Sequence, residues 1–549
     1  MDRLPFVKSP LSSKNTRHGE SVNENADLTT RDDTLFENPQ FEHYEATSNL
    51  QLFFDLFFVA NLTSFTNSHE VNSKESLASY VGFICILWFT WCQVTLYDVR
   101  FATDSLFERI AHACHFGVMV GLAVIGPLFL QDPNGWDPLQ QLSLILMGSR
   151  IVLLCQYSTT LFFTWRFKQT RVPLLLVIAS LAIAIIIYLG VSFAFYNQTS
   201  YDAYIAWYFV AVSEVVVNVS VAAIWPAVSL LKTHLAERMT CLTLIILGEG
   251  IIGLTKTIVK IDGMDKKFTS GDIGMIISAV LIIYIVYQLY FDNLSNGQAL
   301  GSRRQHIWAI LHFPFHLALC LMMEGTNQTL LWYHITTDLD SIFNSLSTAI
   351  DNESPTGLRA SMSEIFTTVF SRFETTEEVF NEAQMSLNET LSLPADANFT
   401  EVISVGFTLI TDSYKTVIED FGWETPEETS NEGAEGFLES YDAILSVFNL
   451  TFGYFAVCTG LILIFISILS ILSFNHKNVH HWLQYLSTAV NLLIGLGIVL
   501  LSTITLTSNA ETLGESSWTL PVLMLILLAL LVLHHLPRGR YRPVIANQD

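Results

Sequence analysis

The sequence predicts an all-α membrane protein with about twelve transmembrane helices in two parallel six-helix repeats, plus an acidic helical insertion outside the membrane. Hydrophobic residues make up 51% of the 549 positions and charged residues only 14%, against about 25% charged in a typical soluble domain. The apolar residues fall in runs of about 20, the length that crosses a bilayer as a helix. Sliding the chain along itself by 194 positions also aligns five polar residues with residues of the same kind, which indicates an internal duplication.

Twelve apolar segments are each interpreted as one membrane helix. The first half holds segments at residues 49–66, 78–97, 110–130, 142–165, 173–195 and 203–228. The second half holds segments at residues 239–258, 273–291, 307–332, 448–472, 482–506 and 520–536. The first segment is the shortest of the first half, and it contains an acid, Asp55.

These segments divide the chain into six expected parts. They are a disordered cytoplasmic tail (1–48), the first six-helix repeat (49–230), the first three helices of the second repeat (236–334), an acidic helical outer loop (335–446), the last three helices of the second repeat (447–537) and a cytoplasmic tail (538–549). The first tail is polar and rich in Ser, Asn, Asp and Glu, which is typical of disorder.

The basic residues predict which side of the membrane each loop faces, because cytoplasmic loops carry the excess of Lys and Arg. These residues gather in alternate loops, and the intervening loops are nearly bare except for Lys74 and a group from Lys256 to Lys267. Both termini of this multi-pass protein are therefore expected in the cytoplasm, in the plasma membrane or an endomembrane. Three glycosylation sequons fall in the expected outer loops, at Asn197, Asn388 and Asn398.

The outer loop carries most of the negative charge of the chain. Between Asp338 and Asp442 there are 22 acidic and three basic residues, which supply −19 of the formal net charge of −24. Apolar residues recur at helical spacing over residues 342–373 and 401–418, which predicts a small acidic helical cap. The cap is either a solvated extracellular domain or a vestibule that attracts cations.

Several partners and cofactors are not expected. No face concentrates the Lys and Arg that contact phosphates, which excludes nucleic acid as a partner. The seven cysteines all fall in apolar segments, so neither a disulfide framework nor a CxxC zinc site is predicted. We expect membrane lipid as the surroundings, cations or protons as ligands and no cofactor, and the sequence leaves a homo-oligomer open.

The 194-residue offset aligns polar residues that lie within or beside apolar segments. The pairs are Asp55 with Glu249, Thr63 with Thr257, Asp98 with Asp292, Arg109 with Arg303, and His112 with His306. With six helices in each half, both halves enter the membrane in the same orientation, as in a parallel repeat about an axis along the membrane normal. Five matches at one ungapped offset favour duplication over chance.

Asp55 and Glu249 are the predicted functional acids. A carboxylate without a partner in hydrocarbon costs about 2.5–3.5 kcal/mol, so each must protonate, meet a cation or line water. Glu249 lies about 15 Å from the start of its segment, near the midplane, whereas Asp55 is shallower unless its helix begins near His43. These two acids, with Thr63 and Thr257, are the predicted ion-pathway residues.

Further ionisable residues are expected to form a charge network at the cytoplasmic ends of the helices and within the membrane. Ion pairing that orients helices is the expected role for most of them, with Arg150 and Glu214 as a cross-helix pair. The full set is Asp98, Arg100, Arg109, His112, His115, Arg150, Glu214, Asp292, Arg303, His306, His312 and His316.

Three motifs are similar to those of the low temperature requirement A (LtrA) family of membrane proteins. They are Leu52-Phe53-Phe54-Asp55-Leu56-Phe57-Phe58-Val59, Tyr97-Asp98-Val99-Arg100-Phe101, and Glu237-Arg238 followed by Ile246-Leu247-Gly248-Glu249. The resemblance covers most of the helical body and implies a polytopic membrane protein. The acidic insertion departs from the compact bacterial pattern of the family.

A second resemblance is to the lysosomal two-repeat potassium channels. Those channels have two six-helix halves, with an acid-bearing Phe-x-Asp motif in the first helix of each. Here Phe54 and Phe58 flank Asp55, and Thr63 and Thr257 each follow their acid by eight residues. The Phe-Ser-Asp triplet of those channels is replaced in both halves. This resemblance implies channel function.

Four functions remain open at this stage. An ion channel or ion-conducting pathway is favoured, because the acids are duplicated and have no predicted partner, and large Phe and Ile neighbours would form the constriction. A proton-coupled secondary transporter would use Glu249 and the histidines as a relay. A structural or receptor-like protein would bind a partner through its cap. An intramembrane metal-dependent hydrolase would draw its ligands from His112, His115, His306, His312 and Asp292. The favoured function is not enzymatic, and no catalytic residue is predicted for it.

Overall fold

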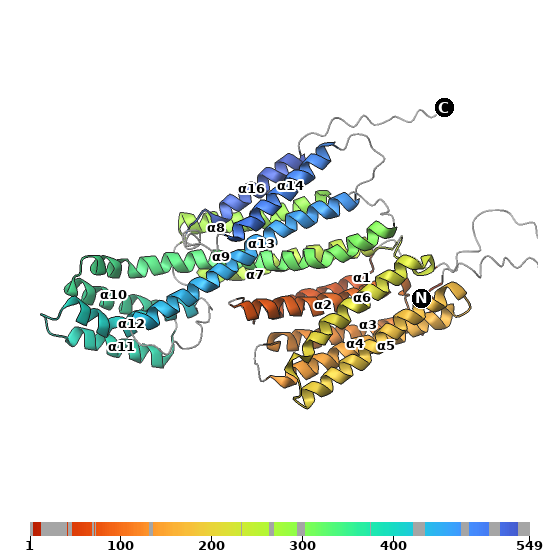
Figure 1. The fold of residues 1–549 in the computed structure, drawn as a ribbon, viewed down its shortest axis with the longest axis horizontal. Coiled ribbons are helices and arrows are strands. Elements are labelled where there is room, and N and C mark those ends of the chain that lie inside the picture. Colours follow the sequence, from red (N-terminus) through yellow and green to blue (C-terminus); the bar gives the residue numbers. More distant parts are fainter. Residues whose placement is uncertain are drawn as a thin grey trace, which may run out of the picture.

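The computed structural model describes residues 4–11, 41, 47–68, 71, 73–130, 135–231, 233–262, 268–293, 302–373, 375–420, 434–473, 482–503 and 516–535. Within these ranges nearly all residues are helical, and an isolated antiparallel bridge joins Leu11 to Phe41. Figure 1 shows long helices that run side by side, with a group of shorter helices at one end. The predicted all-α class is confirmed.

The first half of the chain forms six long helices. They are α1 (Asn49–Thr66), α2 (Lys74–Phe101), α3 (Leu106–Ile125), α4 (Trp136–Thr164), α5 (Lys168–Tyr196) and α6 (Ile205–Ile224). The first three each begin after a serine, Ser48, Ser73 or Ser105, whose hydroxyl accepts a hydrogen bond from an orphan backbone N–H of the first turn. Helix α1 packs on α2 and α3, α4 packs on α3 and α5, and α6 packs on α2 and α5.

The second half also contributes six long helices. They are α7 (Leu235–Asp262), α8 (Ser270–Asn293), α9 (Ser302–Asp351), α13 (Ala434–Ser473), α14 (Trp482–Leu501) and α16 (Thr519–His535). Helix α7 packs on α8 and α9, α13 packs on α9 and α14, and α16 packs on α8 and α14. These packing partners correspond, helix for helix, to those of the first half.

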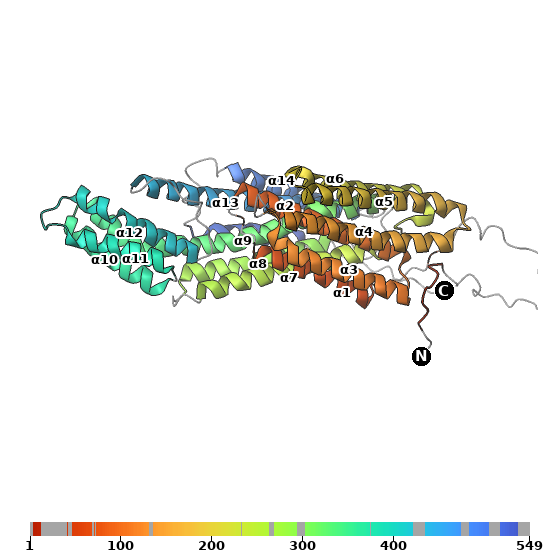
Figure 2. The same cartoon turned by 90° about the horizontal axis from the view of Figure 1, so that it is seen from below.

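Three shorter helices form the cap, which we define as α10 (Pro355–Arg372), α11 (Glu377–Ser392) and α12 (Phe399–Asp420). Figures 1 and 2 show α9 and α13 extending from the long helices to this cap. The predicted acidic helical insertion is confirmed. Its expected limits at 334/335 and 446/447 fall inside α9 and α13, which continue as helices beyond their apolar segments.

A buried polar cluster joins the cap to the long helices. His334 of α9 lies between two carboxylates, with Nδ1 3.3 Å from Asp272 of α8 and Nε2 3.7 Å from Asp338. Arg372 of α10 lies 3.2 Å from the same Asp338 carboxylate. The cluster holds the cap against α8 and α9, and charge-assisted contacts of this kind favour one geometry.

Nine helices in the described ranges are long and apolar enough to cross a membrane. The other three predicted segments correspond to α1, whose apolar sequence contains the polar residues Asp55 and Asn61, and to the shorter apolar helices α14 and α16. The structure begins α1 at Asn49, so Asp55 lies within the second turn. This agrees with the shallower of the two positions considered for Asp55.

Part of the N-terminal segment is ordered against the long helices, unlike the expected tail. The carbonyls of Pro5 and Phe6 accept hydrogen bonds from the first backbone N–H groups of α3, at Leu106 and Phe107. Phe41 packs edge-on against the Phe101 ring at 5.0 Å. The polar composition does not predict these contacts, because they depend on a few residues whose carbonyls pair with free backbone N–H groups at the start of a helix. Most of residues 1–46 lies outside the described residues.

Candidate functional site

The two halves meet where α1 and α2 pack against α7 and α9. Residue numbers rise together in the contacts between α1 and α7, so these two helices run parallel. Helix α9 is parallel to α7 by the same criterion and continues to the cap. We call the end near the cap outer and the opposite end inner. From inner to outer, the side-chain pairs between α1 and α7 are Asp55 with Arg238, Thr63 with Glu249, and Asn67 with Lys256.

A buried charge cluster, the inner network, lies at the inner end of this interface. It consists of Asp55 of α1, Thr95 and Asp98 of α2, His112 of α3 and Arg238 of α7. The Arg238 guanidinium donates to Asp55 Oδ1 at 2.7 Å and to Thr95 Oγ1 at 3.2 Å. Its Nη1 lies 3.9 Å from Asp98 Oδ2, and His112 Nε2 lies 3.3 Å from that oxygen. Asp55 and Arg238 are both 0% exposed, so this ion pair is removed from water.

Asp55 therefore has partners, contrary to the expectation of an acid without one. Besides Arg238, the indole Nε1 of Trp91 donates to Asp55 Oδ1 at 2.7 Å. Even so, Asp55 Oδ2, Asp98 Oδ1 and Arg238 Nε make no hydrogen bond within the described part of the chain. Buried polar atoms without a partner are uncommon. These atoms are suited to binding water or exchanging a proton.

A hydrogen-bonded chain extends the inner network toward α4. Glu108, a residue that was not predicted, accepts from the Tyr97 hydroxyl at 2.7 Å and from Gln156 Nε2 at 2.8 Å. Gln156 Oε1 lies 3.0 Å from His115 Nε2. His112 Nδ1 lies 3.0 Å from the backbone carbonyl of Glu108. The two histidines of α3 thus belong to one buried polar region.

Other predicted charges of the first half have separate partners. Arg150 and Glu214 form a buried ion pair between α4 and α6, with Nη2 to Oε2 at 2.9 Å. Arg100 is buried, and it donates to the Tyr157 hydroxyl at 2.9 Å and to Asn218 Oδ1. Arg109 is exposed and lies 3.0 Å from Asp104. The first two groups hold helices together, and the third is a surface pair of little energetic weight.

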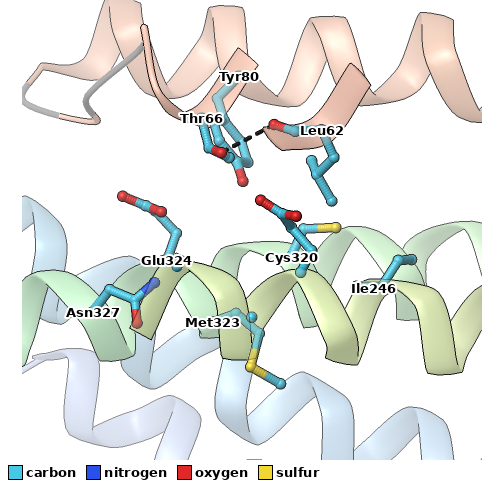
Figure 3. Close-up of a pocket in the computed structure, with 11 residues that line it drawn as sticks. Leu62, Thr66, Tyr80, Ile246, Cys320, Met323, Glu324 and Asn327 are labelled. Carbon is cyan, nitrogen blue, oxygen red and sulfur yellow. Dashed lines mark hydrogen bonds between the residues drawn. The ribbon is translucent and has the colours of Figure 1, made fainter. Parts of the chain in front are cut away.

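A second polar site, the outer cavity, lies between α1, α2, α7 and α9 and is shown in Figure 3. Its volume of about 30 Å³ has room for about two water molecules. The Thr63 hydroxyl donates to Glu249 Oε2, and Gln328 Nε2 donates to Glu324 Oε1 at 2.9 Å. The polar lining residues are Thr66, Tyr80, Glu249, Glu324 and Asn327.

Apolar side chains separate the inner network from the outer cavity. On α1, Phe58 and Leu62 follow Asp55 by three and seven residues, on the face that is buried in the protein. On α7, Leu242 and Ile246 follow Arg238 by four and eight residues, and both are buried. At 1.5 Å per residue, the two polar sites are about 12–17 Å apart along the helices.

Most predicted residues of the second half lie outside these two sites. Asp292 is partly exposed and lies 3.2 Å from His535, whereas its counterpart Asp98 is buried. The Thr257 hydroxyl donates to the Gly253 carbonyl of its own helix at 3.2 Å. His306 is buried, and the side chain of Arg303 is outside the described residues. The 194-residue offset therefore aligns residue types whose surroundings differ.

His312 and His316 are buried and bonded to neutral groups. His312 Nε2 lies 2.9 Å from the Tyr290 hydroxyl, while His316 Nδ1 accepts from Trp88 Nε1 at 3.1 Å. His316 Nε2 is also 2.9 Å from the Thr243 hydroxyl. Among the described residues, no three His, Cys, Asp or Glu side chains gather so that they could hold a metal ion. The histidines proposed for a metal hydrolase are thus divided between α3 and α9.

Sequence reasoning missed several residues of the two sites. Arg238 was noted only as part of a family motif, because a basic residue near a helix end is usually an interfacial anchor. Its acidic partner lies 183 positions away, and no local pattern indicates such a contact. Glu324 and Asn327 stand out as polar residues in an apolar segment, which is the local signal that could have placed them beside Glu249.

The long apolar helices of the described ranges, joined by buried charges, define a multi-pass helical membrane protein. Residues 46–346 match the family described as "Bacterial low temperature requirement A protein (LtrA)", and the chain belongs to this family. The match includes all residues of the inner network and the outer cavity. No curated protein and no solved structure matches this chain.

Proposed function

We propose that the protein is an ion-transport protein that carries cations or protons across the membrane along the interface between α1 and α7. One observation carries the proposal: the interface between the two halves holds two groups of ionisable side chains at different depths. Asp55 of α1 pairs with Arg238 of α7 at one depth, and Glu249 of α7 and Glu324 of α9 line a cavity at the other. Charged groups within a membrane are costly and usually belong to a transport path or a proton relay.

The arrangement of the two sites supports a gated path. The inner network contains polar atoms that lack hydrogen-bond partners, and the outer cavity contains two carboxylates. Between them, Phe58, Leu62 and Ile246 provide a hydrophobic constriction of the kind that gates channels. A cavity of about 30 Å³ matches a small ion better than an organic solute.

We further propose that the two halves arose by duplication and act as two repeats. The aligned polar residues and the corresponding packing partners support this. The contacts between α1 and α7 pair residues 183 to 189 positions apart, not 194, so Asp55 and Glu249 lie at different depths. The repeats therefore differ by a shift along the membrane normal of roughly 8–16 Å at 1.5 Å per residue.

The orientation in the membrane remains a proposal that basic residues and sequons support. Both termini are proposed to be cytoplasmic, with the cap on the opposite side. Asn197, Asn388 and Asn398 are exposed, as glycosylated residues must be. Mass change on treatment with a glycosidase, compared among single Asn→Gln variants of the expressed protein, tests this orientation.

A flux assay in liposomes tests the transport function. Glu249→Gln keeps the shape of the side chain but removes its charge, so we expect cation or proton flux to fall about tenfold or more. Asp292→Asn is the matched control, because it changes the aligned but partly exposed acid and should leave flux unaltered. Equal flux from wild type and Glu249→Gln, both well above empty liposomes, would contradict the proposal.

A proton-coupled carrier is the second candidate, favoured by the contact between His112 and Asp98. Histidine changes its charge near physiological pH, and this one lies in the same network as Asp55 and Arg238. A carrier predicts solute uptake that requires a pH gradient and is lost in His112→Gln. A channel predicts cation flux that continues without a pH gradient.

A further inference from the structure

We propose that the outer cavity binds one dehydrated divalent cation of the hard, oxygen-preferring class, with Ca²⁺ as the best match, held by Glu249 and Glu324. The idea that this ion is cargo rests on the proposed function. The binding itself does not, and it can be tested without measuring transport.

The cavity presents oxygen ligands from four helices. Glu249 and Glu324 contribute carboxylates from α7 and α9. The Thr66 hydroxyl donates to the Leu62 carbonyl at 3.0 Å, as drawn in Figure 3, which leaves its lone pairs available to a cation. Carboxylate, hydroxyl and amide oxygens are the ligands that Ca²⁺ prefers.

Two buried polar side chains point to a ligand independently of the acids. Tyr80 is 1% exposed, and its hydroxyl, which Figure 3 shows directed into the cavity, makes no hydrogen bond within the described ranges. Asn327 is 8% exposed and lines the same cavity, and its side-chain amide likewise makes no hydrogen bond there. Since buried polar groups normally have partners, both groups fit the lining of a binding site.

Charge and size select the class of ion. The two carboxylates carry a formal charge of −2 in a largely buried site, and the nearby Lys256 is exposed and donates to Asn67 Oδ1 at 2.8 Å. A divalent cation neutralises the two acids, which burial favours. The cavity of about 30 Å³ has room for an ion with about one water, whereas Mg²⁺ usually keeps several waters.

Close packing of α7 on α9 shapes the site. A Cβ atom at Gly253 would come within 2.6 Å of the Asn327 amide, and one at Gly250 would come within 2.6 Å of Met323 Sδ. Glycine at these two positions lets the helices approach until Asn327 reaches the cavity. Gly253→Ala should therefore move Asn327 and weaken binding while both carboxylates remain.

Thermal unfolding of the purified, chelator-treated full chain in detergent tests the proposal. Unfolding is followed during separate titrations with CaCl₂, MgCl₂, NaCl, KCl and ZnCl₂, with choline chloride keeping the ionic strength constant. We expect Ca²⁺ to raise the melting temperature in a saturable way, because a ligand that binds only the folded state stabilises it. Glu249→Gln and Glu324→Gln should each weaken the apparent Kd for Ca²⁺ about tenfold or more, and Gly253→Ala and Tyr80→Phe should weaken it less.

The controls separate the cavity from the acidic cap. Glu364→Gln changes an exposed acid of the cap and should leave the response unaltered, as should Thr255→Val on the exposed face of α7. A Ca²⁺ response that persists in both cavity variants would assign the ion to the cap and overturn the proposal. A response to Na⁺, K⁺ or Zn²⁺ alone, or none beyond choline chloride, would also overturn it. Saturable Ca²⁺ binding without measurable flux in liposomes would support this site while contradicting the transport function.

Discussion

The two halves of the molecule use the same residue types in different surroundings. In the first half, Asp98 is buried beside His112 and Arg238, whereas the aligned Asp292 is partly exposed and faces His535. Asp55 is held by a guanidinium and an indole, whereas Glu249 is held by a hydroxyl and faces a cavity. Residues that the 194-residue offset aligns therefore lie in different chemical surroundings.

The difference follows from how the halves meet. Helices α1 and α7 are parallel but shifted relative to the sequence offset, so Thr63, not Asp55, lies beside Glu249. The shift gives the interface two polar levels separated by apolar residues, where a symmetric arrangement would put both acids at one level. Under the proposed transport function, this shift gives an ion two successive sites along the interface, one near Asp55 and one near Glu249.

The largest expected effect comes from removing Arg238. Arg238→Gln leaves Asp55 buried without its cation, and breaking a buried ion pair in this way costs about 3–5 kcal/mol. By contrast, Asp292→Asn breaks a partly exposed contact and should cost about 0–1 kcal/mol. Thermal unfolding of both variants in detergent, at a pH near 7, measures the contrast between the halves.

A double variant sharpens this result. Arg238→Met combined with Asp55→Leu replaces the pair with apolar side chains of comparable size, which is often neutral for stability. We expect the double variant to be more stable than Arg238→Gln but inactive in flux. If Arg238→Gln melts at the same temperature as wild type, the inner network is not the buried ion pair described above.

The aligned threonines offer a smaller and closely matched contrast. Thr63→Val removes a hydrogen bond to the Glu249 carboxylate, and bonds to charged groups contribute about 1.5–3 kcal/mol. Thr257→Val removes only a bond to a carbonyl of its own helix and should have little effect. Both variants are compared by thermal unfolding and by flux. Equal effects of the two substitutions would mean that the halves are functionally equivalent at this position.

The smallest expected effect lies in the cap, which only the second half carries. Burial, with Glu382 nearby, raises the pKa of Asp412 in α12 to about 6, although Lys415 acts in the opposite direction. The folded state thus holds the proton more tightly than the unfolded state. Stability from this group is full below pH 4 and is lost as the pH rises through 6. Asp412→Asn should stabilise the cap at pH 8 by about 1 kcal/mol, since partial exposure reduces the effect, and hardly at pH 4. Melting curves of wild type and variant at the two pH values test the sign, and a larger gain at pH 4 would reverse it.

The fold was predictable from sequence to a large extent because a membrane span leaves a strong local signal. Nine helices of the described ranges are long and apolar enough to cross a membrane, and α1, although Asp55 and Asn61 lie inside it, is still mostly apolar. The extension of α9 to the cap was missed because hydropathy ends near Trp332 while the helix continues to Asp351. The length of an apolar run reflects the thickness of the bilayer that the segment crosses, and the helix itself can continue beyond that run.

The candidate site was only partly predictable. Asp55 and Glu249 stand out as acids within apolar sequence, and the structure buries both. Arg238 and Glu324 depend on contacts between helices that lie far apart in the chain, which pattern alone cannot supply. Asp292 and Thr257 have different surroundings from Asp98 and Thr63, with which they align, and a sequence offset carries no information on the shift between α1 and α7.

The most direct test of the central claim is the flux of cations or protons through liposomes that contain Leu62→Ser. Leu62 is buried between the inner network and the outer cavity, so a polar side chain there should hydrate the constriction and raise flux severalfold over wild type. Leu153→Ser, at an equally buried position of α4, controls for leaks caused by loosened packing and should not raise flux. A rise in Leu62→Ser alone is the predicted result. Unchanged flux in Leu62→Ser, or an equal rise in both variants, would contradict a path between α1 and α7.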